Sequence, residues 1–544
     1  MDTRRLYDYI IVGSGTAGCV LASRLTENPA TQVLVLEAGG WDRDPFIHIP
    51  LGFGRNAGVH HDWLYRSEPH PAIGGRTMEQ ARGKVIGGCS SVNAMTHVRG
   101  HRSDYDRWAA SGLTHWSYAH ALPYFRKQET WAHGANDFRG GNGPIAVQRN
   151  HYSDPISAAY AAAGRSLGYP STNDYNAQEQ EGFSVHQVTI GNGRRSSAAV
   201  AYLRPAMKRG NLTVKVHAQA TRVLFDRDRA VGVEYLSRGQ LHAVYANDEV
   251  ILAGGAVNSP QLMMLSGIGE PQHLGRHGVK TMLPLRGVGR NLQDQVVVRL
   301  AYSRNEPGPF HRMMRADRAA VEFSRSYLFG TGMASSLPSA GIAFLKSRPD
   351  LPAPDLQIVT AATPPDARPY LPPFRQPYRD LFVTRVILLR PESRGGIRLG
   401  SPEPLARPRI YQNILTSDRD LATLRAGVRI LGDLARQESM RPFIGREVGA
   451  VPADDSDTVI DAFVRGTAVS FRHTLGTCRM GLASDPDAVV DPELRVIGLK
   501  ALRIVDASVM PDMVGGNINA AVLMIAERAA DLIRGEEPLP PAGP

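Results

Sequence analysis

The chain has 544 residues, of which 42% are hydrophobic and 21% charged, and its formal net charge is +10. This length and balance indicate a globular protein of two or three domains whose core could enclose a sizeable cofactor. Basic residues alternate with acids, so we do not expect a nucleic-acid partner. No apolar run is long enough to cross a membrane and the first residues lack a signal-peptide core, so we expect no integral membrane segment and a cytoplasmic location.

The cysteines exclude two further classes of protein. Cys19, Cys89 and Cys478 are too few for a disulfide framework. None of them belongs to a C-x-x-C pair, which is the usual spacing for zinc or haem attachment. We therefore expect no bound metal.

The N-terminal region has the pattern of a strand, a tight turn, a helix and a second strand. The apolar run 9–12 is followed by Gly13, Gly15 and Gly18 in G-x-G-x-x-G spacing, and the run 32–37 ends in Glu37. The glycines would permit a tight turn and close approach of a pyrophosphate to the helix N-terminus. Glu37 would accept hydrogen bonds from a ribose and disfavour NADP. The unit predicts a dinucleotide site but does not distinguish NAD from FAD.

Three more segments narrow the choice of cofactor. Residues 81–100 (ARGKVIGGCSSVNAMTHVRG), 250–269 (VILAGGAVNSPQLMMLSGIG) and 502–533 resemble the glucose-methanol-choline (GMC) oxidoreductases, in particular the choline dehydrogenase-like flavoproteins. Together with GVGRNLQDQ at 287–295 and LLRPESRGGIRLG at 388–400, the resemblance covers nearly the whole chain. It implies FAD as the cofactor and alcohol oxidation as the activity.

The resemblance also implies which residues contact the FAD. Segment 81–100 carries a loop of small residues along which a flat ring could pass, although such a loop can also be an ordinary turn. The helix predicted to begin near Asn519 would direct its positive N-terminal end at the flavin. The expected cofactor residues are Gly13, Ser14, Gly15, Thr16, Ala17, Gly18, Glu37, Ala38, Arg82, Val85, Gly87, Gly88, Ser90, Ser91, Asn93, Ala94, Ala220, Asp506, Ala507, Asn517, Ile518 and Asn519.

The expected fold is α/β (α+β overall), with a Rossmann-like FAD-binding domain and a substrate domain built on an antiparallel sheet flanked by helices. The FAD-binding domain is assigned to 1–155, 190–300 and 466–535, and the substrate domain to 156–189 and 301–465, before a disordered tail at 536–544.

Several elements are expected within these domains. A helix begins at Ser259-Pro260, strands begin at Leu381 and Gly396, and Ser417 and Asp420 form a capping box at the start of an amphipathic helix. The proline-rich loop 363–377 could be a lid or plain surface.

The segment SFRHTLGTCRMG places His473 five residues from Cys478. This spacing alone is compatible with a metal site, a Cys/His pair, a base or a packed core. The GMC resemblance implies that His473 faces the flavin N5 atom with Asn517 as its partner. His473 would then accept the alcohol proton, and Asn517 would hold the substrate oxygen.

The chain departs from the family pattern at three positions. Val92 stands where members with covalent flavin carry a histidine, so we expect non-covalent FAD. Thr474 replaces a proline after His473, and Gln295 replaces a histidine after Asp294. We expect neither Thr474 nor Gln295 to contact the reaction site.

The predicted function is FAD-dependent oxidation of a primary alcohol, aromatic or of medium size, with O2 or a quinone or other redox carrier as electron acceptor. The alternatives are a lyase that cleaves cyanohydrins and a flavin photodecarboxylase, and the well-placed base disfavours the latter. A homo-oligomer is compatible with the chain. The identity of the alcohol is not legible in the sequence.

Overall fold

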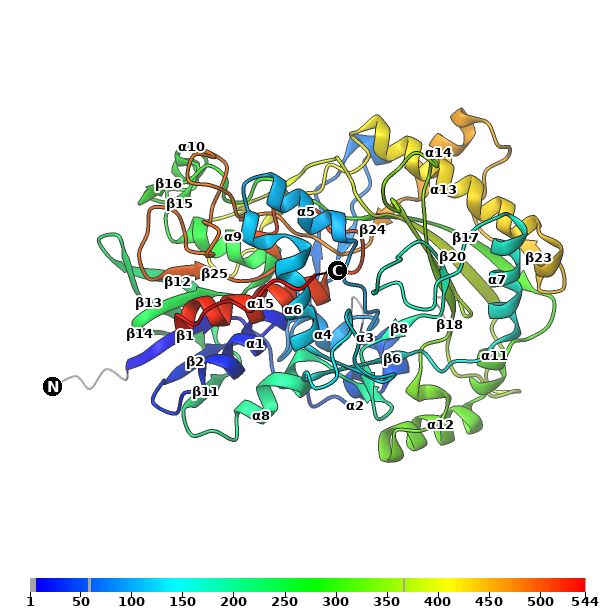
Figure 1. The fold of residues 1–544 in the computed structure, drawn as a ribbon, viewed down its shortest axis with the longest axis horizontal. Coiled ribbons are helices and arrows are strands. Elements are labelled where there is room, and N and C mark those ends of the chain that lie inside the picture. The colour runs from blue at the N-terminus through cyan, green and yellow to red at the C-terminus, as the bar shows by residue number, and fades with distance from the viewer. Residues whose placement is uncertain (1–5, 57–59, 365–366, 544) are drawn as a thin grey trace.

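The computed structural model describes residues 6–56, 60–364 and 367–543. The chain forms two seven-stranded sheets. They occupy different halves of the molecule, on the left and right of Figure 1. We call them the cofactor sheet and the substrate sheet after the roles that the sequence predicts for them.

The cofactor sheet has the strand order β11-β2-β1-β14-β13-β12, and β25 pairs with β14. Its central strands are parallel: Ile10 lies opposite both Leu34 and Val250. All three side chains are fully buried, which fits the apolar runs of the sequence. The strands are β1 (Leu6–Val12), β2 (Val33–Leu36), β11 (Leu212–Lys215), β12 (Gln219–Asp226), β13 (Arg229–Ser237), β14 (Gln240–Leu252) and β25 (Leu502–Ile504).

Two helices from opposite ends of the chain pack side by side against the cofactor sheet (Figure 1). They are α1 (Thr16–Leu25) and α15 (Asn519–Arg534). Their N-terminal residues are joined by a hydrogen bond of 2.8 Å from the Thr16 hydroxyl to the Asn519 side-chain oxygen. An ion pair between Arg24 and Glu527 ties the helices together further along. Two positive helix ends therefore meet at one place.

The substrate sheet is antiparallel and has the order β23-β17-β20-β19-β18-β7, with β24 paired to β17. The strand predicted from Leu381 is confirmed as β20, whereas the one predicted at Gly396, β21 (Gly396–Arg398), pairs outside this sheet with β22 (Arg409–Tyr411). The strands are β7 (Gly182–Ser184), β17 (Val296–Arg304), β18 (Ser339–Leu345), β19 (Leu356–Ala361), β20 (Leu381–Leu388), β23 (Ile444–Glu447) and β24 (Val469–Ser470).

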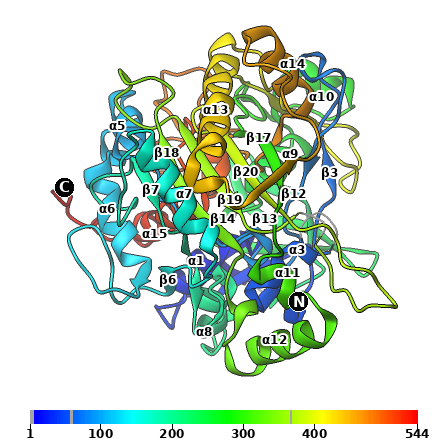
Figure 2. The same ribbon diagram turned by 90° about the vertical axis from the view of Figure 1, so that its right-hand side faces the viewer.

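The two faces of the substrate sheet have different surroundings. Val298 and Val386 belong to a core that also contains residues of α13 (Asp418–Arg436). Figure 2 shows α13 and α7 (Pro155–Ser166) in front of these strands. Because side chains alternate along a strand, the intervening residues face the other way, toward the inside of the molecule.

One predicted helix begins earlier than expected. We predicted a start at Ser259-Pro260, but α9 spans Gly255–Leu265 and contains Pro260. A proline inside a helix leaves the carbonyl four residues before it without its backbone donor. Here that carbonyl belongs to Ala256, and the Thr477 hydroxyl donates to it over 2.6 Å. A side chain remote in sequence thus satisfies the group that Pro260 leaves unpaired.

The capping box predicted for α13 is only half present. The Ser417 side chain accepts a hydrogen bond from the Arg419 amide, as an N-cap should. Asp420 instead accepts from the backbone amides of Glu392 and Ser393, which lie after β20.

No helix in the described part of the chain is both long and apolar enough to span a bilayer.

Candidate active site

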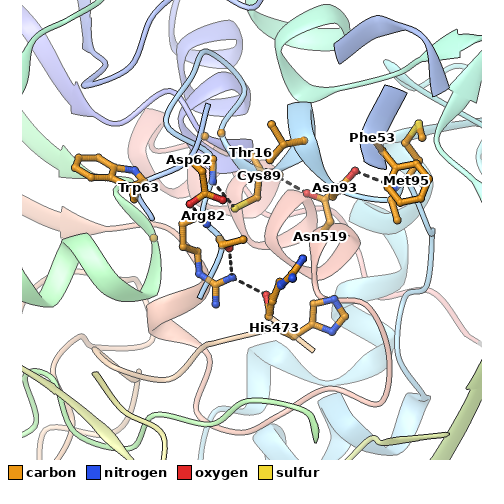
Figure 3. Close-up of a pocket in the computed structure, with 18 of the residues that line it drawn as sticks. Thr16, Phe53, Asp62, Trp63, Arg82, Cys89, Asn93, Met95, His473 and Asn519 are labelled. Atoms are coloured by element: carbon orange, nitrogen blue, oxygen red, sulfur yellow. Dashed lines mark hydrogen bonds between the residues drawn. The ribbon is translucent and has the colours of Figure 1, made fainter. Parts of the chain in front are cut away.

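A cavity of about 1310 Å³ extends from the N-terminal ends of α1 and α15 to the inner face of the substrate sheet. This is more than the volume of an ordinary small-molecule pocket. The cavity has room for a large cofactor and a substrate together. Its walls are formed by segments from every part of the chain, and Figure 3 shows some of them.

Glycines at the first turn leave room for a cofactor. A Cβ atom on Gly18 would lie 1.9 Å from the Gly13 carbonyl oxygen, so Gly18 is required by backbone packing. A Cβ on Gly15 would meet nothing closer than 3.9 Å, and Gly15 lines the cavity. Neither α1 nor α15 has a side-chain N-cap. Their first amide groups therefore suit an anionic group such as the pyrophosphate of FAD.

Glu37 ends β2 at the wall of the cavity. Its carboxylate accepts hydrogen bonds from the Ser14 amide (3.0 Å), the Ser14 hydroxyl (2.7 Å) and the Gly39 amide (2.7 Å). Burial raises the pKa of this carboxyl, while those donors oppose the rise. Glu37 thus joins β2 to the glycine turn and also borders the space that a ribose would need.

Most of the predicted cofactor residues border this one cavity. Ser90 and Ser91 do not, because their hydroxyls donate to the carbonyls of Gly87 and Ile86 within their own loop. The other predicted residues that do not line it are Ser14, Gly18, Val85 and Gly87. Those that line it are Gly13, Gly15, Thr16, Ala17, Glu37, Ala38, Arg82, Gly88, Asn93, Ala94, Ala220, Asp506, Ala507, Asn517, Ile518 and Asn519.

His473 lies beside the substrate sheet. It follows β24, the short strand that adds to the substrate sheet, and it lines the cavity (Figure 3). Its backbone amide donates to the buried Asp294 carboxylate over 2.8 Å. The ring of Phe471 packs edge-on against its imidazole, with centroids 4.6 Å apart. The hydrogen bond of the His473 amide and the contact with the Phe471 ring together fix the position of the imidazole.

Gln295 sets which imidazole nitrogen carries the proton. The Gln295 side-chain nitrogen donates to the carbonyls of Leu389 (3.0 Å) and Val514 (3.3 Å), so its oxygen must be the atom 2.7 Å from Nδ1 of His473. An amide oxygen only accepts, so Nδ1 carries the hydrogen and Nε2 is the unprotonated nitrogen that can accept. The expectation that Gln295 does not contact the site is wrong.

Asn517 donates a hydrogen bond to the unprotonated nitrogen of the imidazole. Its side-chain nitrogen lies 3.3 Å from His473 Nε2, and its oxygen accepts a hydrogen bond from Gln357 over 3.3 Å. Gln357 belongs to β19 and also lines the cavity. The pair predicted from the sequence is therefore together in space, with one member next to the substrate sheet and the other just before α15.

The imidazole is neutral over the whole physiological range. Burial lowers the pKa of His473 to about 3, and the positive charge of Arg82 acts in the same direction. Arg82 donates to the Arg472 carbonyl (2.7 Å) and to the Thr474 hydroxyl. Thr474, like Gln295, therefore contacts the surroundings of the base, contrary to our expectation.

Cys478 takes no part in this arrangement. It is fully buried, and it is not among the residues that line the cavity. Burial raises the pKa of its thiol well above the usual range. The described residues contain no group of three or more histidine, cysteine or acidic side chains that could hold a metal. The geometry thus favours the base over the Cys/His pair and the metal site.

Apolar side chains form part of the cavity wall opposite α1. Phe323 of α12 (Ala316–Phe329) lines it. Part of the proline-rich loop, including Thr363, Pro364, Ala367 and Pro369, also borders it, while residues 365–366 lie outside the described chain. These four residues are thus part of the cavity wall, whereas Leu371 and Phe374 of the same loop are exposed.

Comparisons with known proteins identify the family of the chain. Family models described as GMC oxidoreductase match residues 7–297 and 391–526. The mitochondrial choline dehydrogenase of Homo sapiens is 42% identical over 99% of this chain and 91% of its own length. The oxygen-dependent choline dehydrogenase 1 of Chromohalobacter salexigens is 39% identical over 100% of this chain and 97% of its own.

Solved structures share the fold. Pyridoxine 4-oxidase from Mesorbium loti superposes with a TM-score of 0.87 at 31% identity, covering 98% of this chain and 100% of its own. A formate oxidase structure superposes with a TM-score of 0.87 at 27% identity, covering 98% and 99%. None of these matches favours a lyase or a photodecarboxylase. The chain therefore belongs to the GMC oxidoreductases, and it is an FAD-dependent alcohol oxidoreductase.

Proposed function

We propose that His473 accepts the hydroxyl proton of a primary alcohol at Nε2 while the hydrogen on the carbinol carbon leaves with its electron pair. The observation that carries this proposal is the hydrogen-bond series from Gln295 through His473 to Asn517. In this series Nε2 accepts from the Asn517 amide, and the alcohol hydroxyl would replace that donor at Nε2 when the substrate binds. Bound FAD supplies the acceptor for the two electrons.

Asn517 has a positioning role in this proposal. Its amide cannot titrate, but it can donate a hydrogen bond to the substrate oxygen. Gln357 holds the Asn517 side-chain oxygen, which leaves the amide nitrogen facing His473. Two groups around one oxygen restrict the alcohol to the orientation in which its carbon faces the flavin position.

The residues offer support for non-covalent FAD as well. Val92 lines the cavity at the position where covalent members carry a histidine, and its side chain has no nucleophilic atom. We further propose that O2 or a quinone-type carrier reoxidises the flavin, that the protein works in the cytoplasm, and that copies of the chain can associate.

Anaerobic mixing of the holoenzyme with benzyl alcohol, followed by flavin absorbance, tests the roles of His473 and Asn517. His473→Ala should slow reduction by about 10² to 10⁴, the usual contribution of a general base, with FAD still bound. Asn517→Ala should be slowed less and should keep the pH dependence, since the titrating group remains. If His473→Ala reduces its flavin at nearly the parental rate, the base lies elsewhere.

A further inference from the structure

Two arginines share the substrate end of the cavity. Arg299 of β17 and Arg385 of β20 lie directly opposite each other in the antiparallel ladder, and both line the cavity. They alternate with Val298 and Val386, which pack in the core with α13. The arginines therefore extend from the inner face of the substrate sheet.

Neither arginine has a partner in the described chain. No hydrogen bond or ion pair to a described residue involves the guanidinium of Arg299 or Arg385. Arg195 is a contrasting example of a structural arginine. It is buried and has no acidic partner, but its guanidinium donates to the carbonyls of Ile47 and Asn93 and to the Asn93 side chain. Arg299 is exposed and Arg385 is half-buried, and like charges directly opposite in a ladder repel each other.

The charge at this end of the cavity is positive. Burial and Arg299 lower the pKa of the Arg385 guanidinium to about 10, so it remains charged at neutral pH. Of the acids that line the cavity, Glu37 and Asp506 are at the cofactor end and already accept several hydrogen bonds. The other, Asp62, accepts from the Leu64 and Arg82 amides, also away from the substrate sheet.

We propose that the alcohol substrate carries an anionic group, a carboxylate in the simplest case, and that Arg299 and Arg385 bind it. This inference rests on the proposed function, because the hydroxyl of the same molecule would bind at His473 and Asn517. Gln357, which contacts Asn517, is two residues from Val359, and Val359 lies opposite Arg385. Two residues along a strand span about 7 Å, a distance that a substituted ring or a short carbon chain covers.

The same charges disfavour a cationic substrate. Choline dehydrogenases are among the relatives, but a quaternary ammonium group in this cavity would meet two unpaired guanidinium groups. A cation is bound best by aromatic faces or carboxylates placed around it. The substrate of this chain therefore differs in charge from the one in those relatives' names.

The test compares three primary alcohols with the holoenzyme: 4-(hydroxymethyl)benzoate, its neutral amide 4-(hydroxymethyl)benzamide, and choline. We expect kcat/KM for anaerobic flavin reduction to be about tenfold to a hundredfold higher for the acid than for the amide, as charge-assisted hydrogen bonds would provide. Choline should be the poorest of the three. Raising the ionic strength should reduce the preference for the acid.

Substitutions test whether the two arginines cause the preference for the acid over the amide. Arg385→Met and Arg299→Met should each lose most of the acid-to-amide ratio, mainly through a lower kcat/KM with the acid. Arg385→Lys should retain part of the ratio, because it keeps the charge but not the two-pronged geometry. Arg348→Met, at an exposed arginine outside the cavity, should behave as the parent.

A second measurement needs no turnover. Benzoate should perturb the absorbance of the bound flavin and bind about tenfold or more tightly to the parent than to Arg385→Met, while benzamide should bind both equally. Equal kcat/KM for acid and amide, together with equal benzoate binding by the parent and Arg385→Met, would overturn the proposal. If no alcohol reduces the flavin but benzoate binds through Arg385, the assigned base fails and the anion site stands.

Discussion

At the scale of single residues, the reactivity of His473 depends on a neutral neighbour. Gln295 accepts from Nδ1 without adding charge, so burial keeps the pKa of the imidazole low. A carboxylate in the same place would favour the protonated ring and raise that pKa. The identity of one amide side chain thus sets the pH range over which the base is available.

Gln295→Glu should move the acid limb of flavin reduction to higher pH. In the parent, the competent neutral imidazole is lost only as the pH falls through a pKa of about 3. In Gln295→Glu the neutral imidazole is lost at a higher pH, and the rate of flavin reduction approaches the parental rate only at alkaline pH. Rapid mixing across pH measures this directly.

Gln295→Met is the control of similar shape. It should lower the rate of flavin reduction roughly tenfold, because the imidazole becomes charged in the transition state and has lost a hydrogen bond. The acid limb of its pH profile should not move to higher pH. An unshifted profile in Gln295→Glu would mean that residue 295 does not act on the base.

Sequence reasoning identified His473 and Asn517 because each lies in a recognisable motif. It missed Gln295 because the contact depends on the pairing of β17 with β24, which brings together residues 178 apart. Arg299 and Arg385 were missed for the same reason, since only the antiparallel register makes them neighbours. The pattern of residues within one segment predicts its local structure. It does not predict how two strands pair, and these contacts depend on that pairing.

At the scale of elements, the glycine turn before α1 combines two requirements. Gly18 has backbone directly against it, whereas Gly15 faces open space in the cavity. The backbone of Gly15 is at φ −66°, which alanine adopts without strain. Packing and cofactor binding therefore act on different glycines of one motif.

Gly15→Ala should fold but bind FAD poorly, because the added methyl group would fill space needed by the pyrophosphate. Gly18→Ala should fail to fold or lose much of its thermal stability. Circular dichroism of the FAD-free proteins and the FAD-to-protein ratio after purification separate the two effects. Full FAD occupancy in Gly15→Ala would show that the pyrophosphate does not approach this residue.

Thr477→Val should weaken the packing of α9. The substitution keeps the shape of a fully buried side chain but removes the hydroxyl that donates to the Ala256 carbonyl. We expect the free energy of unfolding to fall by roughly 1 to 3 kcal/mol, the cost of leaving a buried carbonyl unsatisfied. Denaturant titration measures it, and Thr477→Ser, which keeps the hydroxyl, is the control. An unchanged midpoint in Thr477→Val would contradict this account.

The elements that sequence reasoning predicted well are those with strong local patterns, such as β1, α1, β20 and α15. The start of α9 was wrong because Pro260 is common at the first turn of a helix, and the rule overlooks a donor from elsewhere. Asp420 was placed in a capping box for a similar reason, although its carboxylate serves another segment. Local rules fail where a remote group satisfies the backbone.

At the scale of the whole molecule, the cofactor would be held by turns that come from both ends of the chain. Such a ligand stabilises the folded state in proportion to the logarithm of its free concentration, provided that it can dissociate. We predict that the melting temperature of FAD-stripped protein rises with added FAD, by an amount equivalent to about 2.7 kcal/mol at one hundred times Kd.

Acid precipitation should leave the flavin in the supernatant, and a yellow pellet would contradict non-covalent binding at the position of Val92.

The alternation of the substrate sheet also bears on how this protein can change over time. On β17 and β20, Val298 and Val386 share a hydrophobic core with α13, whereas Val297, Arg299 and Arg385 line the cavity. Replacements on the cavity side leave that hydrophobic core intact, so selection can alter the preferred alcohol with little loss of stability. A new specificity could therefore arise by single substitutions at positions such as 299 and 385, while His473 and Asn517, outside these strands, stay unchanged.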